Sequence, residues 1–216
     1  MKKKRNNFDR EIEEKRFRVT IFGSARISKN DKEYKDVYNL AKMIGEREME
    51  LVTGGGPGLM MAASAGHKAG KKNGAHTIGL GVKLYHEQEI NKYVDLWMKY
   101  DRFSRRLDNF MSLSNVIVVA HGGVGTLLEL FYAWQLMQVN HICNIPIILI
   151  GKQWSGLLKW LEKEPLKRKF LEKKDLYLLF HAKDYKEAIK MIDKAHEQYN
   201  NGDKNYCLNY KKYKLY

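Results

Sequence analysis

The feature that most constrains the fold is a run of five apolar residues that leads directly into a cluster of glycines. Residues 116–120 (VIVVA) are followed by residues 121–126 (HGGVGT), after which apolar residues recur at helical spacing to about residue 140. A continuously apolar strand is typical of a sheet that is covered on both faces. The segment therefore predicts a buried strand, a tight glycine turn and the start of a helix.

The same alternation of strand and helix runs through most of the chain. We expect strands at residues 17–23, 49–53, 76–81, 94–98, 116–120, 145–150 and 176–180. We expect the main helices at about residues 31–48, 57–70, 101–115, 127–140, 155–163 and 184–199, the first of them with Asp31 as its N-cap. This order predicts an α/β fold, a Rossmann-like doubly wound parallel sheet of about seven strands with helices on both faces.

Length and hydropathy indicate one domain. The 216 residues suit a single nucleotide-binding domain over residues 17–199, between a basic leader (1–16) and a basic tail (200–216). The leader is not followed by the apolar stretch of a secretory signal, and no run approaches the roughly 18 apolar residues of a membrane span. We therefore expect a cytoplasmic protein with no membrane partner.

Charge and cysteine content narrow the function classes. Much of the formal net charge of +14 lies at the two ends of the chain, and the rest is scattered over helix faces without an aromatic and basic recognition module. Nucleic acid is thus not the expected partner, although binding through the basic ends stays open. The only cysteines, Cys143 and Cys207, are not in a Cys-x-x-Cys motif, and the histidines lack metal-ligand spacing. We expect no metal, no other cofactor and no disulfide framework.

Three turns should open on one rim of the sheet, because each follows a predicted parallel strand. They are residues 23–26, 54–58 and 122–126. One glycine turn alone is usually a tight connection, but two that each start a helix favour a ligand site, and helix amides favour an anion. Neither turn has the dinucleotide fingerprint, and Gly-Lys-Ser/Thr is missing, which excludes a P-loop. A mononucleotide or a sugar phosphate remains.

Glu129 lies one turn inside the helix that follows the second glycine turn, and phosphate binding alone does not explain a carboxylate there. Its most natural use is chemistry on the rest of the ligand. The family resemblance given below implies cleavage of a ribosyl carbon-nitrogen bond, which passes through an oxocarbenium-like state that a carboxylate can stabilise, or to which it can deliver water. We expect Glu129 in that role, with Arg106 holding the substrate and orienting the carboxylate. Hydroxyl groups of Thr126 and Ser24, and the side chain of Arg26, could add donors to a phosphate.

These motifs resemble a known family. The sequence GGGPGLM at residues 54–60, an arginine, and then Gly-Gly-x-Gly-Thr-x-x-Glu are similar to the Lonely Guy (LOG) family, whose members are often labelled lysine decarboxylases. The resemblance covers about residues 17–150. It implies a Rossmann-like homodimer that hydrolyses the N-glycosidic bond of nucleoside 5′-monophosphates, such as AMP or cytokinin riboside monophosphates. The products would be a free base and ribose 5-phosphate.

The resemblance also assigns residues. The family's catalytic arginine falls on Arg106 and its catalytic glutamate on Glu129. Its phosphate-binding residues fall on Gly54, Gly55, Gly56, Gly122, Gly123, Gly125 and Thr126.

This chain departs from the family pattern at three places. Its His121 stands where the family usually has proline, Leu107 where a lysine often follows the arginine, and Leu128 where an acidic residue often precedes the glutamate. Arg105 is an alternative to Arg106 if the helix is shifted by one residue.

Two further questions stay open at the level of sequence. His121 could protonate a leaving base or only pack, and a second carboxylate acting as an acid could be Asp108, Glu87 or Glu89. A non-catalytic nucleotide sensor or carrier that uses the same pocket is the alternative function.

Overall fold

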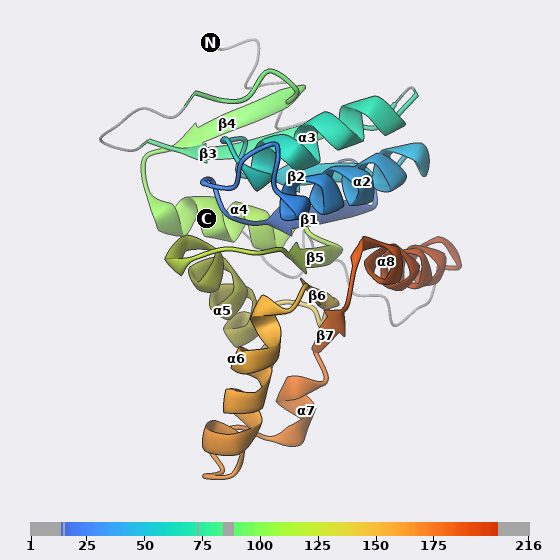
Figure 1. Cartoon of the computed structure of the whole chain (residues 1–216). Coiled ribbons are helices and arrows are strands. Elements are labelled where there is room, and N and C mark those ends of the chain that lie inside the picture. Colours follow the sequence, from blue (N-terminus) through green and yellow to red (C-terminus); the bar gives the residue numbers. More distant parts are fainter. Residues whose placement is uncertain (1–13, 15, 73, 84–88, 203–216) are drawn as a thin grey trace.

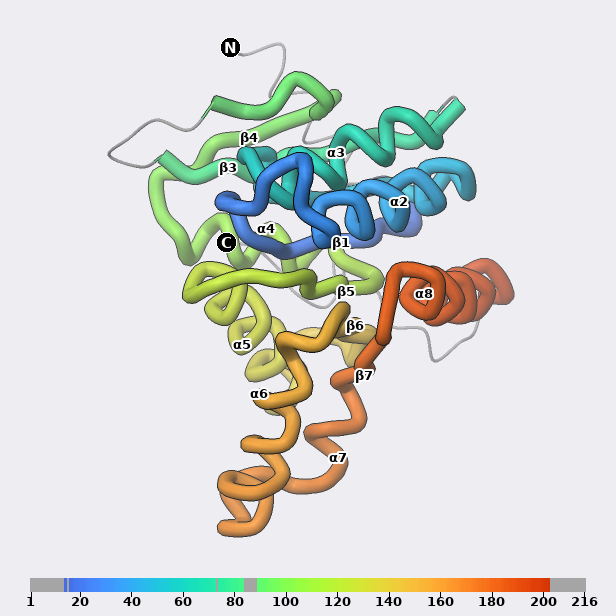
Figure 2. Tube along the Cα trace, in the orientation of Figure 1, coloured from blue at the N-terminus to red at the C-terminus, as the bar shows by residue number. Residues whose placement is uncertain are grey.

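The computed structural model describes residues 14, 16–72, 74–83 and 89–202, and these contain one parallel sheet. The strands are β1 (Arg18–Phe22), β2 (Glu50–Thr53), β3 (Thr77–Val82), β4 (Leu96–Tyr100), β5 (Val116–Val119), β6 (Ile147–Ile150) and β7 (Leu179–Ala182). Their order across the sheet is β4-β3-β2-β1-β5-β6-β7, and every neighbouring pair is parallel (Figures 1 and 2). The predicted seven-stranded α/β fold is confirmed.

Helices cover both faces of the sheet and produce two hydrophobic cores. On one face lie α2 (Lys32–Glu46), α3 (Leu59–Gly70) and α8 (Tyr185–Asn200); on the other lie α4 (Phe103–Leu113), α5 (Val124–Gln138) and α6 (Gln153–Leu161) (Figure 1). Strand β1 supplies both cores, since Val19 and Ile21 face the first layer and Phe22 the second. Side chains alternate along a strand, so one apolar strand serves two layers.

Helices α2 and α3 pack closely because α3 carries glycines where the helices touch. A Cβ atom at Gly66 would overlap the carbonyl of Tyr38, and one at Gly70 would overlap the carbonyl of Lys42. The small side chains of this helix therefore bring it directly against its neighbour. Since α3 starts at the first glycine turn, this contact also fixes the position of that turn.

Some element boundaries differ from the sequence prediction. Strand β4 begins two residues later than expected, because the Asp95 carboxylate, just before the strand, accepts hydrogen bonds from the amide of Thr77 and the side chain of Lys71. Strand β7 begins three residues later than expected, because a short helix, α7 (Lys173–Leu176), and a turn precede it. A π-helical turn, Glu162–Leu166, follows α6 and contains Pro165. Neither the π-helical turn nor α7 was predicted.

The expected Asp31 N-cap lies at the right position but bonds differently. Asp31 precedes α2, yet its carboxylate accepts a hydrogen bond from the amide of Ser28 at 2.8 Å and not from the helix. Cys143 is buried and disulfide-bonded, a single bond that the sequence did not lead us to expect, while Cys207 lies outside the described residues.

Two features of the described residues bear on possible partners. None of the described helices combines the length and the apolar character that a membrane crossing needs. The described part of the chain holds no group of three or more His, Cys, Asp or Glu side chains arranged for a metal ion.

The order of the strands places the ligand site. Strands β2 to β4 extend the sheet on one side of β1, and β5 to β7 extend it on the other, so the direction of winding reverses between β1 and β5. Ligands of open parallel sheets bind beyond the carboxyl ends of the strands at such a point.

Candidate functional site

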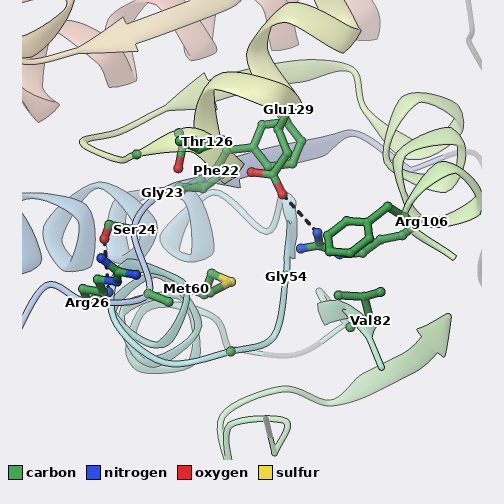
Figure 3. Close-up of a pocket in the computed structure, with 18 of the residues that line it drawn as sticks. Phe22, Gly23, Ser24, Arg26, Gly54, Met60, Val82, Arg106, Thr126 and Glu129 are labelled. Carbon is green, nitrogen blue, oxygen red and sulfur yellow. Dashed lines mark hydrogen bonds and ion pairs between the residues drawn. The ribbon is translucent and has the colours of Figure 1, made fainter. Parts of the chain in front are cut away.

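A cavity of about 490 Å³ lies beyond the carboxyl ends of the strands around this reversal point (Figure 3). All three predicted turns contribute to its wall, which confirms that they open on one rim. The polar and glycine residues that line it are Gly23, Ser24, Arg26, Gly54, Gly56, Gly81, Glu89, Arg106, Gly123, Gly125, Thr126 and Glu129.

The first glycine turn (Gly54–Gly58) is buried and has a fixed shape. Gly55 and Gly58 have φ values of +70° and +64°, in the region that glycine tolerates best, and a Cβ at Gly58 would overlap the carbonyl oxygen of Ser24. The buried Asn91 amide donates hydrogen bonds to the carbonyls of Gly55 at 3.0 Å and Gly56 at 3.1 Å. The backbone of this turn therefore serves mainly to hold the cavity wall in place.

The second glycine turn (Gly122–Thr126) is more open. Gly123, Val124 and Gly125 are exposed, and α5 begins here with Gly123 as an N-cap that has no side chain to bond the helix amides. Amides of a first helical turn have no acceptor within the helix, and they lie at the positive end of its dipole. The turn therefore presents donors toward the cavity, where an anion would be stabilised.

Gly122 gives this turn its compactness. A Cβ atom at this position would overlap the hydroxyl of Thr126, so only glycine allows the threonine to lie directly against the turn. Thr126 is buried, and it lines the cavity.

The other side of the cavity holds an ion pair. Arg106 from α4 and Glu129 from α5 point toward each other, with 3.2 Å between Nη1 and Oε1, while Thr126 lies one turn before Glu129 on α5 and Ser24 lies across the cavity from Arg106 (Figure 3). Both side chains of the pair are largely buried, at 11% exposure each. One cavity thus combines a helix start that would stabilise an anion with an ionisable carboxyl group.

Arg106 is fixed by three further contacts. Its Nε donates a hydrogen bond to the carbonyl of Leu80 at 2.7 Å, and its guanidinium lies 5.0 Å from the ring centre of Phe110. A Cβ at Gly54 would come within 2.6 Å of Nη2, so the arginine lies against the first glycine turn. Arg105 is exposed and does not line the cavity, so Arg106 is the arginine that the structure places beside Glu129.

Burial changes the pKa of the Glu129 carboxyl group. Loss of solvent raises the pKa of Glu129 to about 7, and the charge and hydrogen bond of Arg106 oppose that rise. Burial likewise lowers the pKa of Arg106, against the opposing effect of Glu129. A carboxyl group with a pKa near 7 can both accept and release a proton at neutral pH, as general acid-base catalysis requires.

Most of the predicted site residues meet in the cavity. Ser24, Gly54, Gly56, Gly123, Gly125, Thr126, Arg106 and Glu129 line it. Gly55 and Gly122, which were also expected to bind phosphate, are not among the lining residues: the Gly55 carbonyl accepts a hydrogen bond from Asn91, and Gly122 lies against Thr126.

The positions of His121 and of the candidate acids reduce the number of residues that could act as a second acid in the cavity. The His121 ring packs on Gly151, where a Cβ would overlap it, and His121 is not among the cavity-lining residues. Asp108 accepts a hydrogen bond from the hydroxyl of Tyr132 and also lies outside the lining. Glu89 does line the cavity, and Glu87 lies outside the described residues.

Sequence reasoning missed two polar side chains that hold the turns. Asn91 binds the first glycine turn, and Gln153, at the start of α6, binds the backbone of Gly122. Neither belongs to a motif, and each is more than 30 positions from the turn that it holds. Only the polar character of the segment around Asn91 offered a signal.

Comparison with known proteins identifies relatives. The sequence model of the family described as possible lysine decarboxylase matches residues 60–192. The pyrimidine/purine nucleotide 5′-monophosphate nucleosidase of Escherichia coli strain K12 is 29% identical over 145 residues. The match covers 64% of this chain but 32% of the relative, so the chain spans about a third of the length of this nucleosidase.

Solved structures share the fold. The molybdenum cofactor carrier protein of Chlamydomonas reinhardtii superposes with a TM-score of 0.60 at 24% identity, over 85% of this chain and 99% of that one. A molybdenum cofactor binding protein from Rippkaea orientalis gives a TM-score of 0.59 at 22% identity, over 82% and 94% of the two chains. Both likenesses show the Rossmann-like architecture.

Proposed function

Since the chain belongs to the family described as possible lysine decarboxylase, the LOG family that its motifs resemble, we propose that it is a nucleosidase for nucleoside 5′-monophosphates. The proposed reaction cleaves the N-glycosidic bond and yields a free base and ribose 5-phosphate. The observation that carries the proposal is the buried Arg106–Glu129 pair in the same cavity as the open second glycine turn.

The substrate would lie across the cavity. Its 5′-phosphate would bind the first-turn amides of α5 with the hydroxyl groups of Thr126 and Ser24, and Arg26 at the exposed rim would add a positive charge. Binding energy at the phosphate would then position the ribose near Glu129. Apolar side chains from Met60, Val82 and Phe103 line the remaining wall and offer a surface for the base.

Cleavage breaks the bond between C1′ and the base nitrogen, whose electron pair leaves with the base. Positive charge then develops on the ribose, where the Glu129 carboxylate can stabilise it and accept a proton from the attacking water. The water oxygen bonds to C1′, and the base nitrogen takes up a proton. Arg106 would keep Glu129 oriented, and Glu89 is the described candidate for an acid among the carboxylates considered from sequence.

The test is chromatography of products after incubation with a panel of nucleotides. We expect base and ribose 5-phosphate in equal amounts, and a loss of at least ~100-fold in rate for Glu129→Gln, which keeps the shape but not the ionisable group. Glu162→Gln on an exposed turn is the control and should leave the rate unchanged. Absence of base release from every nucleotide, or equal release by Glu129→Gln, would refute the proposal.

A non-catalytic carrier or sensor is the second candidate function. The molybdenum cofactor carrier and binding proteins share this fold, and the same cavity could hold a nucleotide without turnover. In that case a nucleotide would raise the unfolding temperature while no base appears.

We further propose that the protein is a homodimer that pairs through α5. This helix exposes Val124, Leu128 and Phe131 on one side, and its C-cap Val139 is exposed as well, with Val124 84% exposed. Such a row of apolar side chains is typical of an interface. Because Val124 also lines the cavity, the second copy would lie at its mouth.

Leu128→Glu should convert a dimer to a monomer in light scattering coupled to gel filtration, whereas Lys42→Glu on α2 should not. A wild-type monomer at micromolar concentration would contradict this assembly. Cytoplasmic location and the absence of nucleic-acid partners stay predictions from sequence.

A further inference from the structure

The side-chain amide of Gln153 binds both backbone groups of Gly122. The Gly122 amide donates to Oε1 at 3.0 Å, and Nε2 donates to the Gly122 carbonyl at 2.6 Å. The two residues are 31 positions apart: Gly122 lies in the turn after β5, and Gln153 is the first residue of α6, which follows the neighbouring strand β6. A pair of hydrogen bonds to one residue fixes the orientation of its peptides as well as their position.

The position of Gly122 determines the position of the rest of the second glycine turn. Its Cα lies directly against the Thr126 hydroxyl, and Gly123 to Gly125 follow it without a break. Those residues are exposed, and apart from their own neighbours along the chain no described atom lies within 4 Å of a Cβ added at Gly123 or Gly125. The amides at this turn are therefore held by α5 itself, through its buried residues, and by the anchor at Gly122.

The segment that leads into Gln153 is itself held by hydrogen bonds and packing. The turn that precedes it is tied to β7, since the Gly151 amide donates to the Ala182 carbonyl at 3.1 Å and the His181 ring lies 2.9 Å from the Gly151 carbonyl. The His121 ring packs on Gly151 in addition. The β6 side of the sheet therefore supports the second glycine turn at both His121 and Gly122.

We propose that Gln153 is a positioning residue for the substrate phosphate. It holds Gly122 so that the amides of the α5 N-terminus and the Thr126 hydroxyl face a 5′-phosphate in one arrangement. This role rests on the proposed nucleosidase function and names a residue outside the motifs that led to it. Gln153 does not line the cavity, so it acts through Gly122 and not by touching the substrate.

The role predicts an effect on phosphate binding that is separate from stability. Gln153→Leu keeps the approximate size and removes both hydrogen bonds; Gln153→Glu keeps an acceptor, loses the donor and adds a negative charge. We expect the Kd of ribose 5-phosphate in calorimetry to rise ~10-fold for Gln153→Leu and more for Gln153→Glu. The KM for AMP should rise similarly, and kcat should stay within ~3-fold.

Gln198→Leu, on the exposed side of α8 and away from the cavity, is the matched control and should change neither constant. The unfolding temperature of Gln153→Leu should stay within ~2 °C of wild type, because both hydrogen bonds lie at the surface. An unchanged Kd for ribose 5-phosphate, an equal change in Gln198→Leu, or a kcat loss with unchanged KM would overturn the role.

Failure of the enzyme proposal gives a different result. If wild type binds ribose 5-phosphate but releases no base from any nucleotide, the nucleosidase function fails, and the calorimetric comparison still decides the role of Gln153. If wild type does not bind ribose 5-phosphate, the role of Gln153 is overturned as well.

Discussion

The two glycine turns look alike in sequence but differ in how they are held. The first, Gly54–Gly58, is almost entirely buried, contains two residues with positive φ and is bonded from inside by Asn91. The second, Gly122–Thr126, has no residue with positive φ, is exposed over its middle three positions and is anchored from one side by Gln153.

The difference shows that glycine serves two purposes in one site. In the first turn it allows a backbone conformation and a close approach that a side chain would prevent. In the second turn Gly123 and Gly125 leave space in which a ligand can approach the helix amides. The first turn is thus part of the scaffold, and we expect the second to present the groups that bind the ligand.

Alanine at one glycine of each turn should give the largest contrast. Gly58→Ala places a Cβ on the Ser24 carbonyl at a φ of +64°, and we expect a loss of about 3 kcal/mol or more in the free energy of unfolding. Gly123→Ala meets no described atom within 4 Å and should change that free energy by less than ~1 kcal/mol. Urea denaturation measures both, and similar losses would erase the distinction.

Arg106 joins the two turns, because it lies against Gly54 and pairs with Glu129. If the ionised form of Glu129 acts, wild-type kcat/KM should rise as the pH increases through about 7. Since Arg106 lowers the pKa of Glu129, Arg106→Gln should move this rise to higher pH and reduce kcat/KM by ~100-fold at pH 7.

A pH-rate profile of wild type and Arg106→Gln tests the coupling between the two side chains. Arg105→Gln, an exposed neighbour on the same helix, is the control and should keep the wild-type profile. A profile for Arg106→Gln that falls in rate without moving in pH would mean that the arginine binds substrate but does not tune Glu129.

The hydrogen bonds of Asn91, which anchor the first turn, should contribute more to the free energy of unfolding than a hydrogen bond at the surface. Asn91→Ala leaves the buried carbonyls of Gly55 and Gly56 without this donor and should cost about 2 kcal/mol in stability. Asn109→Ala removes a similar hydrogen bond at the surface and should cost less than ~0.5 kcal/mol. If urea denaturation gave equal values for the two variants, the first turn would not depend on its internal bonds.

The smallest effect is expected at Gly125. Alanine is the better helix former, and the position lies in the first turn of α5 with no described atom near the added Cβ. Gly125→Ala should therefore raise the free energy of unfolding by ~0.5 kcal/mol while it raises the KM for a nucleotide, because the methyl group enters the cavity. A destabilised variant with unchanged KM would mean that Gly125 supports the fold and does not face the ligand.

The sequence was sufficient for the strands and the main helices, though not for α7 or the π-helical turn, and the two side chains that it singled out, Arg106 and Glu129, line one cavity. Buried strands and glycine turns have strong local patterns, so the seven strands and the shared rim were predicted correctly. The choice between Arg105 and Arg106 depended on helix phase, which the structure decides by burying Arg106.

Contacts between separate segments of the chain could not be predicted from the sequence. Gly55 and Gly122 look like binding residues in a motif, yet their roles depend on Asn91 and Thr126 packed behind them. Gln153 is an ordinary polar residue at a helix start until the fold brings it to Gly122. The same holds for β4, whose start is set by the Asp95 carboxylate from outside the strand pattern.

The hydrogen bond from Arg106 to the Leu80 carbonyl has a consequence for synthesis. It joins α4, which leads into the second half of the sheet, to β3 in the first half, while Glu129 arrives later in translation. A nascent chain that ends before Glu129 lacks one member of the ion pair, however well β1 to β4 have formed. Ligand binding would therefore report that both halves of the chain have docked, and coexpressed fragments divided between α4 and β5 would regain it only on reassembly.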